Sequence, residues 1–395
     1  MHRAKRTRFL FFHAADQGFV DVAALLRGEA RPASVRQLYA ISILCADEYP
    51  VTRSELDRLV ELPSGEWVEV DETPELRRFA KQGLIVTDED EPETARLRAL
   101  DERLEAANWN VYGALYHSLS RWHDVDAGLI EKTSVPDGEL VDVVDRFLER
   151  YGPPPSPFHR RTNGSAPLEL PLVRPEGALY RTLGERETTR LFTGDSLSQD
   201  DLAVILYYVF GCQGYAAMTD DVVALRKTSP SGGALHPIEC YPLLVSVDGI
   251  SPGLYHYDVA RHALEPMARL GSAAAAELAV EFAAGQFYFR DAAALFILTA
   301  RFDRAFWKYR NHERAFAVVV MDAAHLSQTF YLVCAERGLG AFVTGAINSV
   351  NVDERLAIDG FTEGSLVLLG CGARAEQPSF LQPKFHPFVP RETAL

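Results

Sequence analysis

The longest apolar run of the chain, residues 315–335, constrains the fold more than any other stretch. Asp322, His325 and Gln328 interrupt it, so the run does not have the composition of a membrane span. We expect it to lie in a helix that is continuous from Arg304 to Gly338. Apolar residues surround this helix instead of forming one stripe, which indicates burial on several sides and a place for a second subunit.

Composition excludes several classes of function. The chain has 395 residues, of which 47% are hydrophobic and 24% are charged, as is typical of a soluble globular protein. A formal net charge of -15 argues against a nucleic acid as the main partner. Five cysteines without a CxxC pair indicate neither a disulfide framework nor a metal site. The N-terminus lacks the pattern of a signal peptide, so we expect a cytoplasmic protein without a membrane partner.

The C-terminal half alternates short helix and strand patterns from Pro171 onward. Helices are expected over Ser198–Phe210, with Ser198 as the N-cap, and over Ala273–Gly285. Strand patterns cover Pro242–Val247, Gly253–Ala268 as a hairpin, Ala293–Ala300, Leu339–Gly345 and Ser365–Gly370. The fold class is therefore α+β.

The first hundred residues predict a smaller module. A strand over Arg8–Val22 is followed by helices over Ala33–Ala46, Arg53–Leu62 and Pro74–Gln82 and a strand over Leu84–Thr87, which is close to a winged-helix order. Residues 33–100 hold 15 acidic and 8 basic residues, a net of -7, which disfavours nucleic-acid binding. The module is either a docking surface for a peptide or for the other domain, or a purely structural element.

A connecting segment follows this module. Leu97–Trp122 is expected to form one long helix, with Trp109, Tyr112, Tyr116 and Trp122 near one face for packing. The stiff tract Gly152–Pro157 and the polar stretch Arg160–Ser165 indicate a linker. We therefore expect divisions at residues 1–100, 101–165 and 166–395.

Two stretches have the residue types of an anion or ring site. In Arg226–Tyr241, RKTSPSGGALHPIECY, the adjacent Gly232 and Gly233 allow backbone N–H groups to face a planar or anionic ligand. The alternative is a glycine-rich turn before a strand. In GERETTRLF, alternate residues of an extended chain point the same way, so Arg186, Thr188 and Arg190 would suit a phosphate. The alternative is a solvated surface.

Two further stretches are candidates for chemistry. In FVTGAI, backbone N–H groups of Thr344, Gly345 and Ala346 could face a ligand, although an ordinary helix-to-strand turn has the same pattern. The adjacent Lys308 and Tyr309 could border one cleft at the start of a helix and supply a general base. A charged helix face with Tyr309 packed beside Phe306 is the alternative.

Together and in this order, the four stretches resemble the flavin-dependent nitroreductase superfamily, specifically its SagB-type branch, over residues 177–372. SPSGGALHPIECY is the most specific element, and GLYHYD and the pairing of KY with AERGLGAFVTGAIN support it. The resemblance implies a nitroreductase-like FMN-binding fold with a mostly antiparallel sheet flanked by helices. It also implies an obligate homodimer with FMN at the interface.

The resemblance also implies roles for individual residues. Lys308 and Tyr309 match the pair implicated as catalytic in azoline dehydrogenases. Thr188 stands where the family motif has Ser, and Thr344 where an acidic residue is frequent. The implied cofactor contacts are Arg186, Thr188, Arg190, Lys227, Ser229, Pro230, Ser231, Gly232, Gly233, Thr344, Gly345 and Ala346.

Members of this branch act on ribosomally made precursor peptides, typically oxidising thiazolines and oxazolines to azoles. Lys308 or Tyr309 would remove the proton alpha to the carbonyl, while hydride would leave the neighbouring carbon for flavin N5. One alternative is the reduction of dehydroamino acids or nitroaromatics with NAD(P)H. Another is a flavin-free adaptor that presents a precursor peptide through residues 1–100. A cyclodehydratase or another maturation enzyme is a candidate partner.

Overall fold

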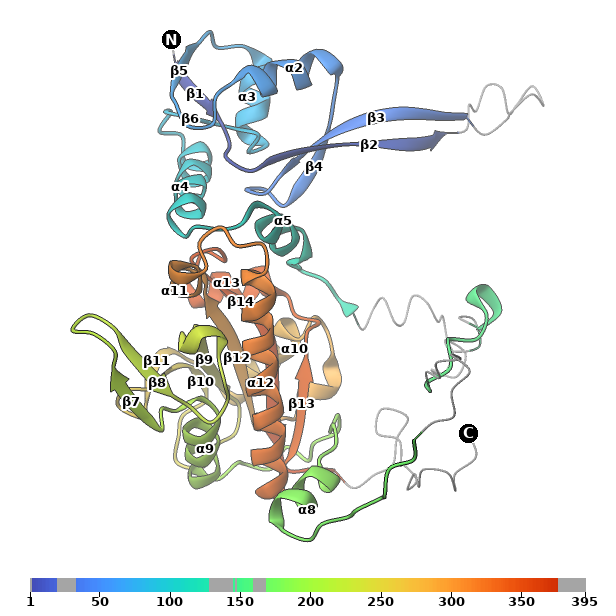
Figure 1. Ribbon diagram of the computed structural model, residues 1–395, viewed down its shortest axis with the longest axis vertical. Coiled ribbons are helices and arrows are strands. Elements are labelled where there is room, and N and C mark those ends of the chain that lie inside the picture. Colours follow the sequence, from blue (N-terminus) through green and yellow to red (C-terminus); the bar gives the residue numbers. More distant parts are fainter. Residues whose placement is uncertain (1, 20–32, 128–144, 146–147, 159–167, 376–395) are drawn as a thin grey trace.

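The computed structural model describes residues 2–19, 33–127, 145, 148–158 and 168–375. A smaller N-terminal part lies at one end of a larger part that is built around one long helix (Figure 1). The linker predicted at Gly152–Pro157 is exposed chain without regular structure, whereas Arg160–Ser165 falls outside the described residues.

A six-stranded antiparallel sheet forms the centre of the larger part, in the order β11-β10-β9-β12-β14-β13. This sheet and its helices confirm the predicted α+β fold class. The strands are β9 (Ile238–Leu244), β10 (Gly253–Asp258), β11 (Ala263–Arg269), β12 (Ala294–Arg301), β13 (Gly340–Thr344) and β14 (Glu363–Gly372).

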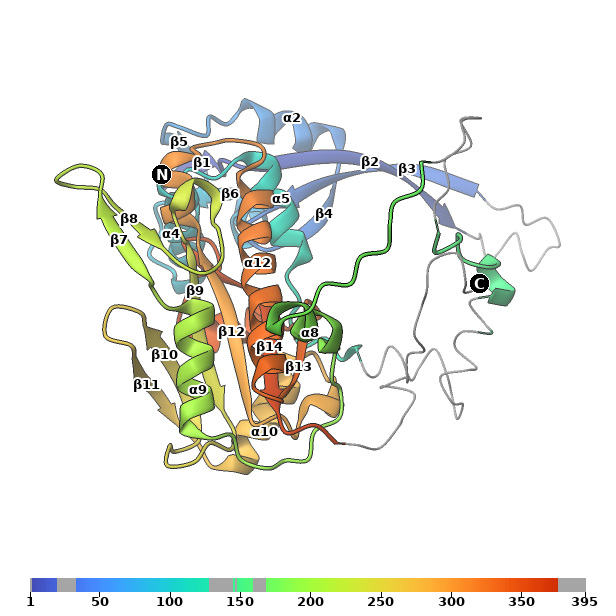
Figure 2. The same cartoon turned by 60° about the horizontal axis from the view of Figure 1, so that its bottom comes forward.

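Alternate residues of the central strand β12 point to opposite faces of the sheet and enter two separate cores. Phe296 faces α12 (Ala315–Glu336), where it contacts Phe330. Leu295 and Ile297 pack on the other face with α10 (Ser272–Phe282) and α13 (Ser349–Leu356). The sheet is thus covered on both faces, and α12 runs along one of them (Figures 1 and 2).

The predicted continuous helix from Arg304 to Gly338 is wrong, because the chain breaks between α11 (Phe302–Lys308) and α12. Asn311 has a left-handed backbone, with φ 50°. Its N–H donates to the Asn108 carbonyl at 2.9 Å, and its own carbonyl accepts from the Asn110 side chain at 3.2 Å. Bonds to a distant segment therefore hold the break, and Lys308 and Tyr309 lie at the end of a helix instead of its start.

Between the linker and the central sheet, the described elements are α8 (Ala178–Glu185), α9 (Gln199–Ile205) and a π-helical turn, Leu206–Phe210. Ser198 caps α9 as predicted, since its side chain accepts from the Asp201 N–H at 3.0 Å. Next come the hairpin β7 (Gly214–Ala217) and β8 (Val223–Arg226) and the 3-10 turn η2 (Gly232–Ala234). A second 3-10 turn, η3 (Phe287–Phe289), precedes β12.

The N-terminal module is richer in strands than predicted. Two three-stranded sheets, β5-β1-β6 and β2-β3-β4, accompany helices α2 (Arg53–Glu61) and α3 (Pro74–Lys81). The strands are β1 (His2–Arg6), β2 (Leu10–Phe19), β3 (Ala33–Ser42), β4 (Asp47–Val51), β5 (Val68–Val70) and β6 (Ile85–Thr87). The helix predicted over Ala33–Ala46 is wrong, because pairing of β3 with β2 and β4 overrides its apolar spacing.

The predicted helix over Leu97–Trp122 is also wrong, since it is two helices, α4 (Pro92–Ala106) and α5 (Val111–Ser120). Asn110 caps α5 by accepting from the Tyr112 N–H at 3.0 Å. Trp109, in the break, is buried, and its indole N–H donates to the Phe361 carbonyl at 2.8 Å. Tyr112 and Tyr116 are exposed instead, so the aromatic residues do not share one packed face.

Among the described residues, α12 is long and apolar enough to cross a membrane, judged by length and composition alone. The core helices of soluble proteins satisfy the same criteria. Here α12 packs on the central sheet through Val319, Leu326 and Phe330, so its apolar composition has a structural explanation.

Candidate functional site

One face of α12 holds the glycine-rich loop by hydrogen bonds. The Asp322 carboxylate is buried and accepts from the Ser231 hydroxyl at 2.6 Å and from the Gly232 N–H at 2.9 Å. Two turns further along α12, Thr329 shares a 2.6 Å hydrogen bond with the Ser229 hydroxyl. Asp322 was not among the predicted site residues, because nothing in an apolar run shows that its carboxylate has a partner about 90 residues away.

The two glycines of this loop are needed because other groups approach them closely. A Cβ on Gly232 would lie 2.2 Å from Val318 Cγ1. Gly233 has φ 64°, and a Cβ there would lie 2.6 Å from Tyr309 Oη and 2.8 Å from Lys308 Nζ. The structure therefore brings Lys308 and Tyr309 together with the loop, around a backbone position that has no room for a side chain.

Lys227 belongs to the same side of α12. It lines a small cleft with Ser229, Ser231, His236 and Asp322. Burial lowers the pKa of Lys227, and the nearby Glu239 carboxylate opposes this effect. His236 fixes the end of the loop, since its N–H donates to Ser231 Oγ at 2.9 Å and its Nε2 lies 3.1 Å from the Leu225 carbonyl. Lys227 is thus part of the loop site and is not beside Arg186.

Arg186 and Thr188 point the same way, as predicted for an extended segment. The Arg186 guanidinium lies 5.2 Å from the centre of the Tyr331 ring, and Thr188 Oγ1 lies 3.0 Å from Tyr331 Oη. The Thr189 N–H donates to the Ala341 carbonyl of β13 at 2.7 Å, which holds the segment against the sheet. Sequence reasoning missed Arg374, which forms an ion pair with Glu187 on this segment.

A buried amide positions the turn that follows β13. The Gln286 side chain donates to the Ala346 carbonyl at 2.9 Å and lies within hydrogen-bonding distance of Thr344 Oγ1. Thr344 Oγ1 in turn accepts from the Ala346 N–H at 3.2 Å. Gln286 was missed because its sequence neighbourhood has no recognisable motif. It fixes the predicted turn of Thr344, Gly345 and Ala346.

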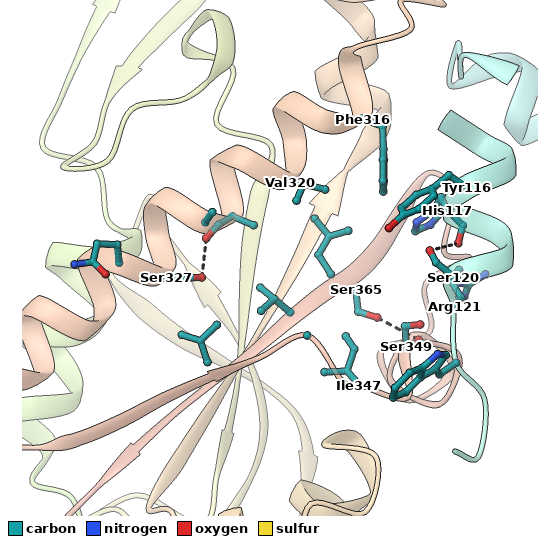
Figure 3. A pocket seen from close by; sticks show the side chains of 18 of the residues that line it. Tyr116, His117, Ser120, Arg121, Phe316, Val320, Ser327, Ile347, Ser349 and Ser365 are labelled. Atoms are coloured by element: carbon teal, nitrogen blue, oxygen red, sulfur yellow. Dashed lines mark hydrogen bonds between the residues drawn. The ribbon is translucent and has the colours of Figure 1, made fainter. Parts of the chain in front are cut away.

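An apolar cavity of about 570 Å³ opens beside this turn (Figure 3). Val320 and Ser327 of α12 lie on one side, and Ile347 and Ser365 on another, while Tyr116 of α5 closes one end. Gly345 and Tyr331 also line the cavity, which links it to the turn and to Arg186. The remaining lining residues are His117, Ser120, Arg121, Trp122, Phe316, Ala323, Ala324, Gln328, Val343, Ser349, Leu366 and Val367.

Within one chain, the four predicted stretches form two half-sites on different faces of α12. Successive helical residues are about 100° apart, so Val318, Asp322, His325 and Thr329 share one face. Val320, Ala324, Ser327 and Tyr331 share the opposite face. Within one chain the loop therefore lies on the other side of α12 from Arg186 and Thr344. In Figure 1, β8 and β13 lie on different sides of α12.

The residues of the two half-sites fit a flavin mononucleotide. Arg186 and Arg190 are half-buried and, with the Thr188 hydroxyl, supply the donor types that a phosphate needs. A Cβ on Gly345 would meet nothing within 4 Å, so the turn borders open space where a flat ring can approach its backbone. The loop half-site adds the glycine backbone and the Lys308–Tyr309 pair.

A model of the nitroreductase family matches residues 183–373 of the chain. A putative nitroreductase of Methanocaldococcus jannaschii is 30% identical over 209 residues, which cover 53% of this chain and 97% of that protein. Trifolitoxin-processing protein TfxB of Rhizobium leguminosarum bv. trifolii is 28% identical over 239 residues, or 57% of this chain. The chain spans only 61% of the length of TfxB.

Two solved structures are similar to parts of the chain. The E. coli microcin synthetase McbBCD complex with truncated pro-MccB17 bound matches with a TM-score of 0.49 and 20% identity, covering 70% of this chain and 94% of the matched chain. A putative nitroreductase from Ralstonia eutropha matches with a TM-score of 0.41 and 23% identity, covering 53% and 89%.

Proposed function

Because the chain belongs to the nitroreductase family, we propose that it is an FMN-dependent oxidoreductase that dehydrogenates thiazoline or oxazoline rings in a ribosomally made peptide. Family membership confirms the nitroreductase part of the resemblance predicted from the sequence. The similarity to TfxB, whose name describes trifolitoxin processing, supports a peptide substrate. The observation that carries the proposal is the convergence of Lys308 Nζ and Tyr309 Oη on Gly233.

When bound, FMN supplies a two-electron acceptor. Arg186, Thr188 and Arg190 would hold its phosphate and ribityl chain. Thr344, Gly345 and Ala346, kept in place by Gln286, would border the ring from the sheet side. Ser229, Pro230, Ser231, Gly232 and Gly233 would border it from the other half-site, with Lys227 behind them.

In the proposed reaction the azoline ring loses a proton and a hydride and becomes an aromatic azole. Lys308 or Tyr309 takes the proton from the carbon alpha to the carbonyl. The left-handed backbone of Gly233 leaves room for both groups to approach the same point, so the base and the loop are positioned together. A positioned general base contributes about 10²–10⁴-fold to such a step.

The proposal requires a homodimer, because the half-sites of one chain lie on opposite faces of α12. A two-fold contact along α12 would bring the loop of one subunit to the Arg186 and Gly345 half-site of its partner. Val320 and Met321 are 45% and 52% exposed in the single chain, and such apolar exposure on a central helix fits a subunit contact.

We also propose a cytoplasmic enzyme whose N-terminal module docks the precursor peptide or a maturation enzyme such as a cyclodehydratase. The module contacts α4, where the Thr7 hydroxyl donates to the Asp101 carboxylate at 2.9 Å, and α5, where the Phe11 ring lies 6.4 Å from the Tyr112 ring. Charge reversal at exposed residues of α2, such as Arg53 and Asp57, should weaken precursor binding. If these variants bind the precursor peptide with unchanged affinity, the docking role is refuted.

The test is azole formation by the double variant Lys308→Ala/Tyr309→Ala, compared with Lys308→Met and Tyr309→Phe alone. We expect each protein to retain FMN absorbance near that of the wild type. The double variant should be slower by at least about 100-fold. Normal turnover by the double variant would refute the catalytic assignment.

A reductase that acts on dehydroamino acids or nitroaromatics is the competing activity, and the coverage of 97% of a putative nitroreductase favours it. Rapid bleaching of the flavin by NAD(P)H without peptide would support this reading. A purified protein with no FMN affinity would instead support a flavin-free adaptor.

A further inference from the structure

The β7–β8 hairpin is an isolated two-stranded ribbon beside the loop half-site. It projects away from β10 and β11 of the central sheet in Figure 2. Tyr215 is 80% exposed, and Val223 is 48% exposed. Two-stranded ribbons are only marginally stable in water, so a third strand or an apolar cover would stabilise this one.

Within the part of the chain that the structure describes, main-chain hydrogen bonding leaves the outer edge of β7 open. The Met218 N–H donates to the Val222 carbonyl at 2.8 Å, and hydrogen-bonded pairs alternate along an antiparallel ribbon. Tyr215 and Ala217 are therefore in non-hydrogen-bonded pairs, opposite Leu225 and Val223, and direct their N–H and C=O groups away from β8. On the other edge, the Leu225 carbonyl faces His236 Nε2 at 3.1 Å.

The same hairpin has one wholly apolar face. Directly opposed residues of an antiparallel pair point to the same side, so Tyr215, Leu225, Ala217 and Val223 form one surface. Acidic residues occur at the turn, where Asp220 and Asp221 lie beyond the ends of the strands. An occupant of this surface would therefore be apolar and extended along β7.

The inner end of the hairpin adjoins the catalytic pair. His236 joins Leu225 of β8 to the end of the glycine-rich loop, and Gly233 of that loop touches Lys308 and Tyr309. A strand added to β7 would span about 13 Å over its four residues. It would lie about 10 Å from β8, on the other edge of the ribbon from His236, with one end at the base of the hairpin.

We propose that the outer edge of β7 binds an extended, apolar stretch of the peptide substrate as a third strand, with the reacting ring beyond its end. Main-chain hydrogen bonds to Tyr215 and Ala217 would supply affinity with little sequence selectivity, and the apolar face would favour hydrophobic side chains. The inference rests on the proposed function, since it requires a peptide substrate.

The test uses the full chain with FMN and a synthetic decapeptide that carries one thiazoline after four apolar residues. Ala217→Pro removes the N–H that faces outward from β7, and an edge strand tolerates this change. Asp220→Pro is the matched control: Asp220 lies beyond the ends of both strands, as the second residue of the turn in which the Val222 N–H donates to the Thr219 carbonyl at 3.4 Å, a position that accepts proline. We expect KM to rise about five- to tenfold in Ala217→Pro and less than twofold in Asp220→Pro, with kcat within twofold in both.

Tyr215→Ser provides a second variant that keeps the backbone, and its KM should rise about threefold with kcat unchanged. Equal KM values for the two proline variants, or an unchanged KM in Tyr215→Ser, would overturn the docking inference while leaving the proposed function intact. Dissociation of the dimer in Ala217→Pro would assign the edge to a second copy of the chain and also overturn it. A wild-type enzyme that neither binds nor oxidises the decapeptide would overturn both proposals.

Discussion

The two faces of α12 differ in how they hold what lies against them. The loop face uses polar groups, because Asp322 and Thr329 bond to hydroxyl and backbone groups of Ser231, Gly232 and Ser229. The cavity face offers Val320 and Ala324 to an apolar space. The comparison teaches that one helix can fix a loop of its own chain on one side while its opposite side faces an apolar cavity.

The largest effect is expected on the cavity face. Val320→Glu should be tolerated by a single chain, because Val320 is 45% exposed there. In a dimer it would bury a carboxylate, so the dimer Kd should rise by at least about 100-fold. Sedimentation velocity measures this, and Val60→Glu on α2, at a residue 53% exposed, is the control. An unchanged dimer would refute the proposed interface.

On the loop face, Asp322→Ala should lower the free energy of unfolding by about 2–3 kcal/mol, because the Ser231 hydroxyl and the Gly232 N–H lose their buried acceptor. Asp322→Asn retains one acceptor oxygen and should cost about 1 kcal/mol. Urea denaturation measures both values. Gln328→Ala, an exposed change on the cavity face, should be near neutral. Equal losses for Asp322→Ala and Gln328→Ala would contradict the difference between the faces.

A smaller effect is expected at the turn beside the cavity. Gln286→Leu keeps the side-chain size but removes the amide that bonds the Ala346 and Ala283 carbonyls. The expected loss is about 1–2 kcal/mol of unfolding free energy. FMN affinity, measured by fluorescence titration, should fall about three- to tenfold. A variant with wild-type FMN affinity would show that the turn does not contact the cofactor.

The smallest expected effect is a change of unfolding free energy with pH, caused by His117 in the cavity wall. Burial lowers the pKa of His117 to about 3, and its Nε2 lies 2.7 Å from the Gly360 carbonyl. The unfolded chain therefore binds this proton more readily, so stability falls as pH drops below about 6.5 toward 3. Between pH 6.5 and 5.5 the loss should be about 1 kcal/mol.

His117→Gln should remove this acid-dependent loss, as urea denaturation at the two pH values can measure. Asp353, which pairs with Arg121, has its pKa raised to about 6 by burial and acts with the opposite sign. Its contribution cancels when wild type and His117→Gln are compared at each pH. Parallel pH profiles for the two proteins would contradict the prediction.

Local signals predicted much of the fold and each half-site separately. Ser198 caps its helix as the sequence indicates, and the apolar run of β12 forms the central strand. Hydrogen bonds between residues far apart in the sequence determine the remaining elements. Asn108 and Asn110 break the helix expected through Asn311, and pairing with β2 turns Ala33–Ser42 into a strand. The separation of the half-sites follows from packing around α12, which no local pattern encodes.

The hydrogen bond from Trp109 to the Phe361 carbonyl has a consequence for how this protein can be recombined. Three side chains of residues 107–121 contact the C-terminal part: the Trp109 ring, the neutral His117 imidazole and the Arg121 guanidinium. An exchange of N-terminal modules between relatives that joined chains within this segment would leave these contacts incomplete. The segment that must be kept with the C-terminal part therefore begins well upstream of the family match. Crossovers between relatives should be placed before Pro92.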